Sequence, residues 1–171
     1  MEDGADAGRV GSVVEVRRAT AEQWPTVKQI RLQALADTPW AFASTLARET
    51  ALDDEAWQQR VGRGAWFLAR ADDGIVGLVA GVSDNDVSEA RQLVGMWVCA
   101  EWRSTETGEA LVQAVRRWAS DDAASALTLW VAATNPRARR FYERLGFRDT
   151  GDRQPLPSTP AVQELRMSLD L

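Results

Sequence analysis

The sequence predicts one domain of the α/β (α+β) class: a mixed, mostly antiparallel sheet of about seven strands flanked by about four helices. The first observation behind this is the order of periodic segments, which reads strand, two helices, three strands, helix, strand, helix and two strands. That order places helices on both faces of a sheet. The second is size, because 171 residues with 45% hydrophobic residues can enclose one ordinary core. We expect a disordered tail at residues 1–12 and the single domain at 13–171.

Composition excludes several classes of protein. Twenty Lys and Arg against 25 Asp and Glu give a net charge of −5, which argues against binding nucleic acid by neutralising phosphates. The chain has no histidine, so zinc sites built on histidine, Ser-His-Asp triads and histidine bases are excluded, and we expect no metal. A single cysteine, Cys99, excludes an internal disulfide. No segment has transmembrane length, so we expect a soluble, cytoplasmic protein without a membrane partner.

The N-terminal segments alternate between strand and helix signals. Residues 13–17 read as a first strand, and Thr20 with Gln23 forms a capping box for a helix of three to four turns. Residues 40–52 have no clean period, which predicts a loop with at most a short turn. A second helix is expected at 53–63, where one of two consecutive aspartates begins it.

Three strands follow in the middle of the chain. Residues 65–71 and 75–82 are apolar strands joined by the turn sequence Asp72-Asp73-Gly74, which predicts a hairpin. Residues 83–89 are polar and acidic, and we expect them to form a solvated loop. The apolar run at 90–98 then predicts a central strand.

The first stretch with a chemical signal connects this central strand to a helix. After Val98 comes a polar loop, and a helix is expected from about Thr107 to Ser120, with Thr107 as its N-cap. The first turn of such a helix directs free N–H groups and the positive end of its dipole toward the loop, which suits a phosphate. An ordinary connection between a strand and a helix is the alternative.

A second stretch follows the strand expected at 126–131. Asn135 and Pro136 have the order of an N-cap and a first helical residue, and Gly146 ends that helix. Two last strands are expected at about 148–152 and 162–169. The segment between them holds three prolines, at positions 155, 157 and 160, which we expect to lie outside strand interiors.

Together the two stretches resemble the GNAT superfamily of N-acetyltransferases. Its Arg/Gln-x-x-Gly-x-Gly/Ala loop matches Arg103 and Gly108, with Glu106 in place of the first glycine. Its Asn-x-x-Ala-x-x-x-Tyr-Glu-x-x-Gly-Phe segment matches from Asn135 to Phe147. The resemblance implies a GNAT-like fold and acetyl-CoA as cosubstrate.

The resemblance also assigns candidate site residues. Tyr142 would be the acid that protonates the leaving thiolate, and the backbone of the central strand would hold the pantetheine arm and the acyl oxygen. Loop N–H groups would hold the pyrophosphate, and some of the arginines at 137, 139, 140 and 144 could contact phosphate. The cofactor-binding candidates are Met96, Trp97, Val98, Arg103, Ser104, Thr105, Glu106, Thr107, Gly108, Glu109, Asn135, Ala138 and Tyr142.

Two positions depart from the pattern of this superfamily. Glu106 lacks the conformational freedom of glycine and adds a negative charge near the pyrophosphate. Gln92 stands where many relatives carry a glutamate base, and glutamine cannot accept a proton. The base would then be another carboxylate, such as Glu89 or Glu164, or a chain of water molecules, unless the amine arrives neutral.

Two functions remain open from the sequence. The first is an acetyl-CoA-dependent N-acetyltransferase acting on an amine of a small molecule or peptide; the alternative is a catalytically impaired GNAT-like module for ligand binding or protein interaction. Trp40, Phe42 and Trp57 either fill the core or line the acceptor pocket. Eight tryptophans leave room for a hydrophobic contact in a homodimer.

Overall fold

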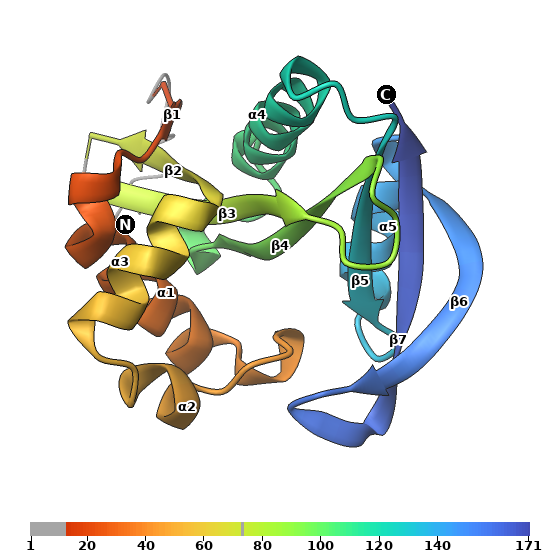
Figure 1. The fold of residues 1–171 in the computed structure, drawn as a ribbon, viewed down its shortest axis with the longest axis horizontal. Helices are drawn as coiled ribbons and strands as arrows, with labels where there is room; N and C mark the ends of the chain where they lie inside the picture. Colours follow the sequence, from red (N-terminus) through yellow and green to blue (C-terminus); the bar gives the residue numbers. More distant parts are fainter. Residues whose placement is uncertain (1–12, 73) are drawn as a thin grey trace, which may run out of the picture.

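The computed structural model describes residues 13–72 and 74–171. The predicted tail at 1–12 and Asp73 of the predicted turn lie outside the described residues. A seven-stranded sheet has the order β1-β2-β3-β4-β5-β7-β6 (Figure 1). All neighbouring strands are antiparallel except β4 and β5, which confirms the predicted mixed sheet. The elements are β1 Glu15–Arg18, α1 Trp24–Asp37, α2 Leu46–Thr50, α3 Asp54–Arg63, β2 Ala65–Ala71, β3 Gly74–Ser83, β4 Ala90–Val98, α4 Thr107–Asp121, β5 Ala126–Ala132, α5 Pro136–Arg144, β6 Arg148–Leu156 and β7 Thr159–Asp170.

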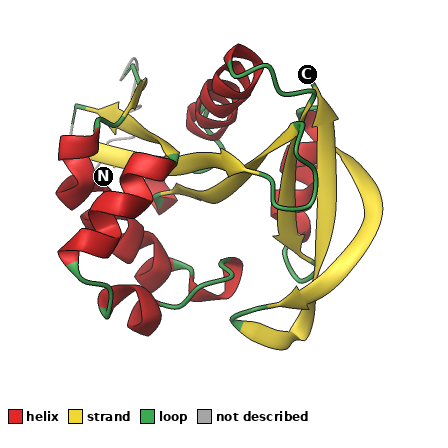
Figure 2. Cartoon of the chain, in the orientation of Figure 1, coloured by secondary structure: helices red, strands yellow, loops and turns green. Residues whose placement is uncertain are grey.

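Helices cover both faces of the sheet, as the element order predicted (Figure 2). Helices α1 and α3 pack on one face, where Trp66 and Leu68 of β2 join their core. Helices α4 and α5 pack on the other, where the alternate β2 residues Phe67 and Ala69 are buried. Successive strand residues point to opposite faces, so β2, with six of its seven residues buried, contributes to both cores.

The N-terminal helices follow the predicted caps, with one addition. The Gln23 side chain accepts the Thr20 N–H at 2.9 Å, as a capping box requires. Asp53 is the N-cap of α3 and accepts the Ala56 N–H at 2.8 Å. The segment expected to be a loop contains the five-residue helix α2, whose N-cap Thr45 accepts the Arg48 N–H at 3.2 Å. One turn of helix is too short to show a period in the sequence.

The prediction for the two last strands was wrong in extent. Pro155 lies within β6 and Pro160 within β7, so the strands run almost to the turn that contains Pro157. Strand β6 is an edge strand, and proline is tolerated there because one side of the strand needs no hydrogen bonds. Pro160 lies near the start of β7. The pairing of β7 with β5 begins only at Glu164, so the part of β7 that contains Pro160 pairs only with β6.

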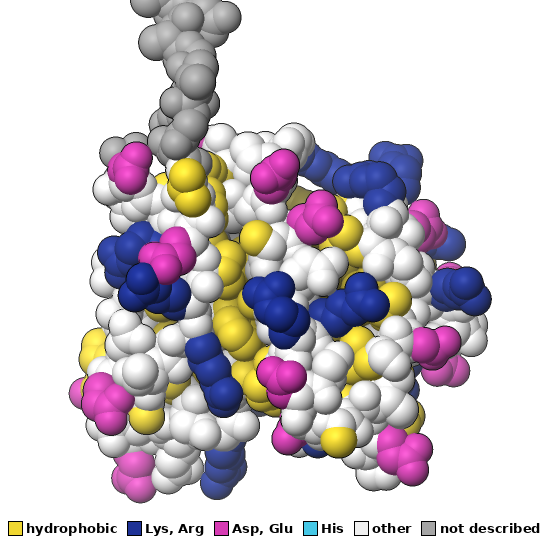
Figure 3. All heavy atoms as spheres, turned by 90° about the horizontal axis from the view of Figure 1, so that it is seen from above, with side chains coloured by type: hydrophobic (Ala, Val, Ile, Leu, Met, Phe, Trp, Pro, Cys, Tyr) yellow, Lys and Arg dark blue, Asp and Glu magenta, His cyan; other side chains and the backbone are white. Residues whose placement is uncertain are grey.

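Charges of both signs are interspersed on the face shown in Figure 3, around a band of hydrophobic side chains. Among the described helices, none is long and apolar enough to cross a membrane.

Candidate functional site

The sheet opens between its two parallel strands. Strands β4 and β5 pair only at their first residues, from Ala90↔Ala126 to Gln92↔Thr128, and then diverge. Gly95 has φ +66°, and the register of β4 against β3 shifts around it, which marks a β-bulge. The edge of β4 beyond Gln92 therefore presents backbone groups that have no partner on β5.

A cleft of about 1340 Å³ runs through this opening. Helices α4 and α5 lie on one face of the sheet at the cleft, and residues of α1 and α3 line it from the other. Its volume exceeds the roughly 300–1,000 Å³ that is typical of a pocket for one drug-sized ligand. The candidate residues in its wall are Met96, Trp97, Val98, Arg103, Ser104, Thr105, Glu109, Asn135, Ala138 and Tyr142.

The three predicted β4 residues face different surroundings. The Met96 side chain packs toward the core under α4 and α5. The Trp97 side chain is buried in the opposite core and donates from Nε1 to Asp37 at 2.9 Å. The Val98 carbonyl already accepts from Arg103 Nε at 2.8 Å. Trp97 can therefore offer its backbone to a ligand, but its indole serves the fold.

Arg103 holds the loop to the rest of the site. Its Nη2 also pairs with the Asp37 carboxylate at the end of α1. The hydrogen bond from Trp97 and the contact with Arg103 lower the pKa of Asp37, in spite of partial burial. The loop after β4 is thus tied to α1 by an ionised carboxylate.

Helix α4 begins at Thr107, as predicted, but its N-cap differs. Thr107 is not the N-cap but the first helical residue, and it is buried. Glu106 occupies the N-cap position with φ −69° and ψ −6°, and its side chain makes no capping hydrogen bond. The Thr105 hydroxyl accepts the Thr107 N–H at 3.3 Å and donates to the Trp102 carbonyl at 2.6 Å.

The expected difficulty at Glu106 does not arise in the backbone. Glu106 is exposed and helical, and the positive φ of the loop occurs at Ser104, with φ +65°. Gly108 is where space is limiting: an added Cβ would lie 3.2 Å from Phe141 Cζ and 3.4 Å from Met96 Cε. Glycine at this position lets α4 begin directly against β4 and α5.

Helix α5 begins as the sequence predicted. Asn135 accepts the Ala138 N–H at 3.1 Å, and Pro136 follows as the first helical residue. Arg137 Nη2 donates to the Ser104 hydroxyl at 2.8 Å and so joins the two motif segments. Arg139 instead pairs with Glu143 at 3.0 Å. Of the four arginines considered for phosphate contacts, those at 137, 140 and 144 line the cleft.

Tyr142 lies at the wall of the cleft with a buried ring. It packs edge-on against Phe141 and Phe147, with centroid distances of 5.2 and 5.6 Å. Burial raises the pKa of its hydroxyl above the ordinary value, so the group stays protonated at neutral pH. No hydrogen bond joins its hydroxyl to another of the described residues.

The carboxylates considered as bases have different positions. Glu89 is exposed, lies at the N-terminal end of β4 and is not in the wall of the cleft; its carbonyl accepts from Ser125 N–H at 2.8 Å. Glu164 on β7 is 4% exposed and lines the cleft, and its Oε1 accepts from Gln154 Nε2 at 3.0 Å. Burial raises the pKa of Glu164, and the hydrogen bond from Gln154 offsets part of that rise.

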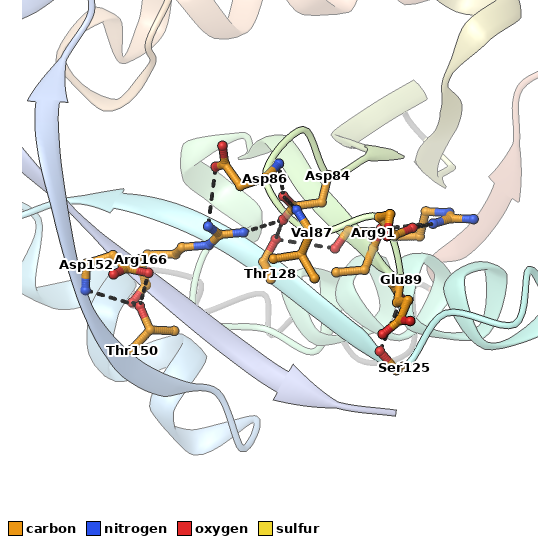
Figure 4. A network of polar contacts seen from close by, with 12 residues as sticks. Asp84, Asp86, Val87, Glu89, Arg91, Ser125, Thr128, Thr150, Asp152 and Arg166 are labelled. Atoms are coloured by element: carbon orange, nitrogen blue, oxygen red, sulfur yellow. Dashed lines mark hydrogen bonds and ion pairs between the residues drawn. The ribbon is translucent and has the colours of Figure 1, made fainter.

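The loop between β3 and β4 is exposed, as expected, except at Asp84, which fixes it to the sheet. Asp84 is 7% exposed and binds Arg166 Nη2 at 2.6 Å and the Thr128 hydroxyl (Figure 4). Its other oxygen accepts the N–H groups of Asp86 and Val87 at 2.8 and 3.0 Å. The network holds the following residues of the loop at the cleft, whose wall includes Asp86.

The three aromatic residues expected either in the core or in the acceptor pocket have different positions. Trp57 is completely buried in the structure. Phe42 is buried and forms part of the cleft wall, and Trp40 is 55% exposed and also lines the cleft.

Sequence reasoning missed Arg31, which is 5% exposed and also lines the cleft. Its spacing of four from both Val27 and Leu35 was an available signal, since that spacing places an arginine on the apolar face of α1.

Comparison with known proteins agrees with this geometry. The model of the acetyltransferase (GNAT) family matches residues 29–147, and the chain belongs to this family. N-acetyltransferase 8F1 of Rattus norvegicus is 26% identical over 125 residues, which are 71% of this chain and 57% of the rat protein. The chain thus matches less than two thirds of that relative's length. Membership in the family supports acetyltransferase activity in general.

Solved structures share the fold. A GCN5-related N-acetyltransferase from Kribbella flavida has 22% identity and a TM-score of 0.70, covering 92% of this chain and 98% of the other. An acetyltransferase of the GNAT family from Streptococcus pneumoniae has 18% identity and a TM-score of 0.76, covering 93% and 99%. At these identities the likeness concerns the fold alone.

Proposed function

We propose that this protein transfers an acetyl group from acetyl-CoA to a primary amine of a small molecule or peptide. The observation that carries the proposal is the cleft between β4 and β5, onto which the loop before α4 and the start of α5 both open. The free edge of β4 suits an extended pantetheine arm, because such an arm can pair with backbone groups as a strand would. The loop from Ser104 to Gly108 suits the pyrophosphate.

The reaction needs few groups from the protein. Acetyl-CoA supplies an activated acyl carbon; the amine nitrogen bonds to that carbon, and the bond from carbon to sulfur breaks. The Tyr142 hydroxyl gives a proton to the departing sulfur, and a base takes a proton from the amine. The unpaired N–H groups along β4 beyond Gln92 are the available donors to the acyl oxygen as it gains charge.

Glu164 is our candidate for the base. It is a buried carboxylate in the wall of the cleft, and one of its oxygens has no hydrogen bond to the described residues. A pKa raised by burial brings a carboxylate nearer to the basicity that proton transfer from an amine requires. Glu89 lies outside the cleft wall and lacks this support.

Titration of CoA and acetyl-CoA by calorimetry tests the proposal, followed by measurement of thiol release with a panel of primary amines. We expect micromolar binding and thiol release that depends on the amine. Binding without transfer to any amine would support the impaired module instead. If neither cofactor binds at millimolar concentration while circular dichroism shows an intact fold, the proposed function is wrong.

A further inference from the structure

A buried cluster of charges joins α1, α2 and α3 at the wall of the cleft. Arg31 on α1 donates from Nε and Nη2 to the two carboxylate oxygens of Glu49 on α2, at 3.0 and 2.9 Å. Arg60 on α3 binds the same carboxylate, with Nη1 3.0 Å from Oε2. Although burial opposes ionisation, the two arginines lower the pKa of Glu49. Two cations against one anion leave the cluster with a net positive charge.

One nitrogen of this cluster has no partner. Arg31 Nη1 is buried and makes no hydrogen bond to any of the described residues. It lies beside the β4 bulge, since a Cβ built on Gly95 would be 3.4 Å from it. The cleft wall includes both Arg31 and Gly95. A buried donor without a partner costs about 1–3 kcal/mol, so a cleft ligand that supplies an acceptor atom here would recover that loss.

The position of Arg31 separates it from the cofactor contacts proposed above. Arg31 belongs to α1, on the opposite face of the sheet from α4 and α5. The loop before α4, which we assign to the pyrophosphate, meets α1 at its last residue, Asp37, which pairs with Arg103 and lies six residues after Arg31. We therefore assign a ligand group at Arg31 to the acceptor and not to acetyl-CoA.

The opposite wall of the cleft has negative charge. Glu164 on β7 has no cation as partner in the described chain, and Asp86 has a side chain that is 65% exposed. Asp86 shares Arg166 with Asp84, which binds that arginine more closely, at 2.6 Å against 3.3 Å. The acceptor part of the cleft thus has a positive wall on the α1 side and a negative wall on the β7 side.

We propose that the acceptor amine also bears a carboxylate, and that Arg31 binds this carboxylate while the amine faces Glu164. The inference rests on the proposed acetyl transfer and names its substrate class: an amino acid or another small amine with an acid group. Uncompensated positive charge favours an anion over a neutral carbonyl, because hydrogen bonds between ionised groups are roughly twice as strong. Phe42, whose ring lies 4.6 Å from the Arg31 guanidinium, keeps this group away from water.

The test compares acceptors that differ only in the acid group. Acetyl transfer by the wild-type protein is measured for the twenty L-amino acids, for their amides and for the amines that lack the carboxyl group. We expect kcat/KM for the reactive amino acids to exceed that of their amides and decarboxylated amines by at least about tenfold. Equal or faster transfer to the compounds without the acid group overturns the proposal and leaves acetyl transfer intact. Transfer to no amine, with CoA bound, refutes acetyl transfer as well.

A variant pair assigns the preference to Arg31. Arg31→Lys keeps one positive charge for Glu49 but lacks the planar guanidinium. We expect its ratio of kcat/KM for acid over amide to fall at least about fivefold, mostly through KM for the acid. Lys28→Met removes a partly buried cation from the same helix, paired with Asp54 at 3.1 Å, and should leave the ratio unchanged. A purely structural role would lower both rates together, so an unchanged ratio in a folded Arg31→Lys protein excludes Arg31 as the contact.

Discussion

Replacing Asp84 by alanine should destabilise the protein far more than its place in a polar loop suggests. The substitution removes the nearer of the two carboxylate partners of Arg166, whose side chain is 9% exposed, and an acceptor of the Thr128 hydroxyl. It also removes the acceptor of two loop N–H groups, at 2.8 and 3.0 Å. Removing one partner of a buried ion pair costs about 3–5 kcal/mol when the other charge stays buried without compensation. Asp86 still contacts Arg166 at 3.3 Å, so the lower end of that range, about 3 kcal/mol, applies here. We expect a loss of that size in the free energy of unfolding.

Urea unfolding followed by tryptophan fluorescence measures this loss. Asp86→Ala is the matched control, because Asp86 contacts the same arginine at 3.3 Å with a side chain that is 65% exposed. An exposed pair contributes about 0–1 kcal/mol. If Asp84→Ala loses less than about 1 kcal/mol, or no more than the control, then the network does not fix the loop and the reasoning fails.

The same substitution has a pH dependence of known sign. Burial by itself would raise the pKa of Asp84, but the hydrogen bonds from Thr128, from the loop backbone and from Arg166 outweigh it, and the folded-state pKa is lowered. A lowered folded pKa contributes stability above the unfolded pKa of about 3.9, and this contribution is lost as the pH falls through the folded pKa. The difference between wild type and Asp84→Ala should therefore be constant near neutral pH and shrink in acid. A difference that grows in acid would contradict the assignment.

Four further predictions concern the cleft. Tyr142→Phe should lower turnover by roughly ten- to a thousandfold and leave CoA affinity within a few fold, because only the leaving-group proton is lost. Stopped-flow or steady-state measurement of thiol release checks this, and unchanged turnover would remove Tyr142 from the mechanism. Asn135→Ala should cost about 1 kcal/mol of stability through the lost cap, and a fall in CoA affinity beyond that, measured by calorimetry, would indicate direct contact. Glu106→Gly should tighten CoA binding by less than about tenfold, because the Glu106 carboxylate is exposed and screened by water. A hundredfold gain in affinity that shrinks as salt is added would instead show that this carboxylate faces the pyrophosphate. Glu164→Gln should remove the rise of kcat/KM with pH that a catalytic base produces. The variant should also be at least as stable as the wild type at neutral pH. The folded-state pKa of Glu164 is raised, so ionisation of this group lowers the stability of the wild type as the pH rises.

Local sequence determined the frame of the site. The order of strands and helices apart from α2, the caps at Thr20, Asp53 and Asn135, and the start of α5 at Pro136 appear in the structure as predicted. These features depend on residues within a few positions of one another, so period and capping chemistry are sufficient to specify them. The two motif stretches were predicted for the same reason, because each is a continuous segment of chain.

Tertiary structure alone decided which distant residues meet. Asp84 and Arg166 are far apart in the chain, and only the pairing of β7 with β5 brings the arginine under the loop before β4. Similarly, Glu49 on α2 binds Arg31 on α1 only because the two helices pack together. No local pattern indicates such pairs, since an isolated acidic residue in a polar segment has the same appearance whether it is solvated or buried.

The prolines and Glu106 show the same limit in the backbone. Pro155 is acceptable in β6 because β6 is at the edge of the sheet, and strand order is a tertiary property. Glu106 is acceptable at the start of α4 because the positive φ of the loop falls on Ser104 instead. Sequence thus determined the segments and the chemistry they carry. The arrangement of segments decided which polar groups lost contact with water, because burial depends on what packs against a residue from elsewhere in the chain.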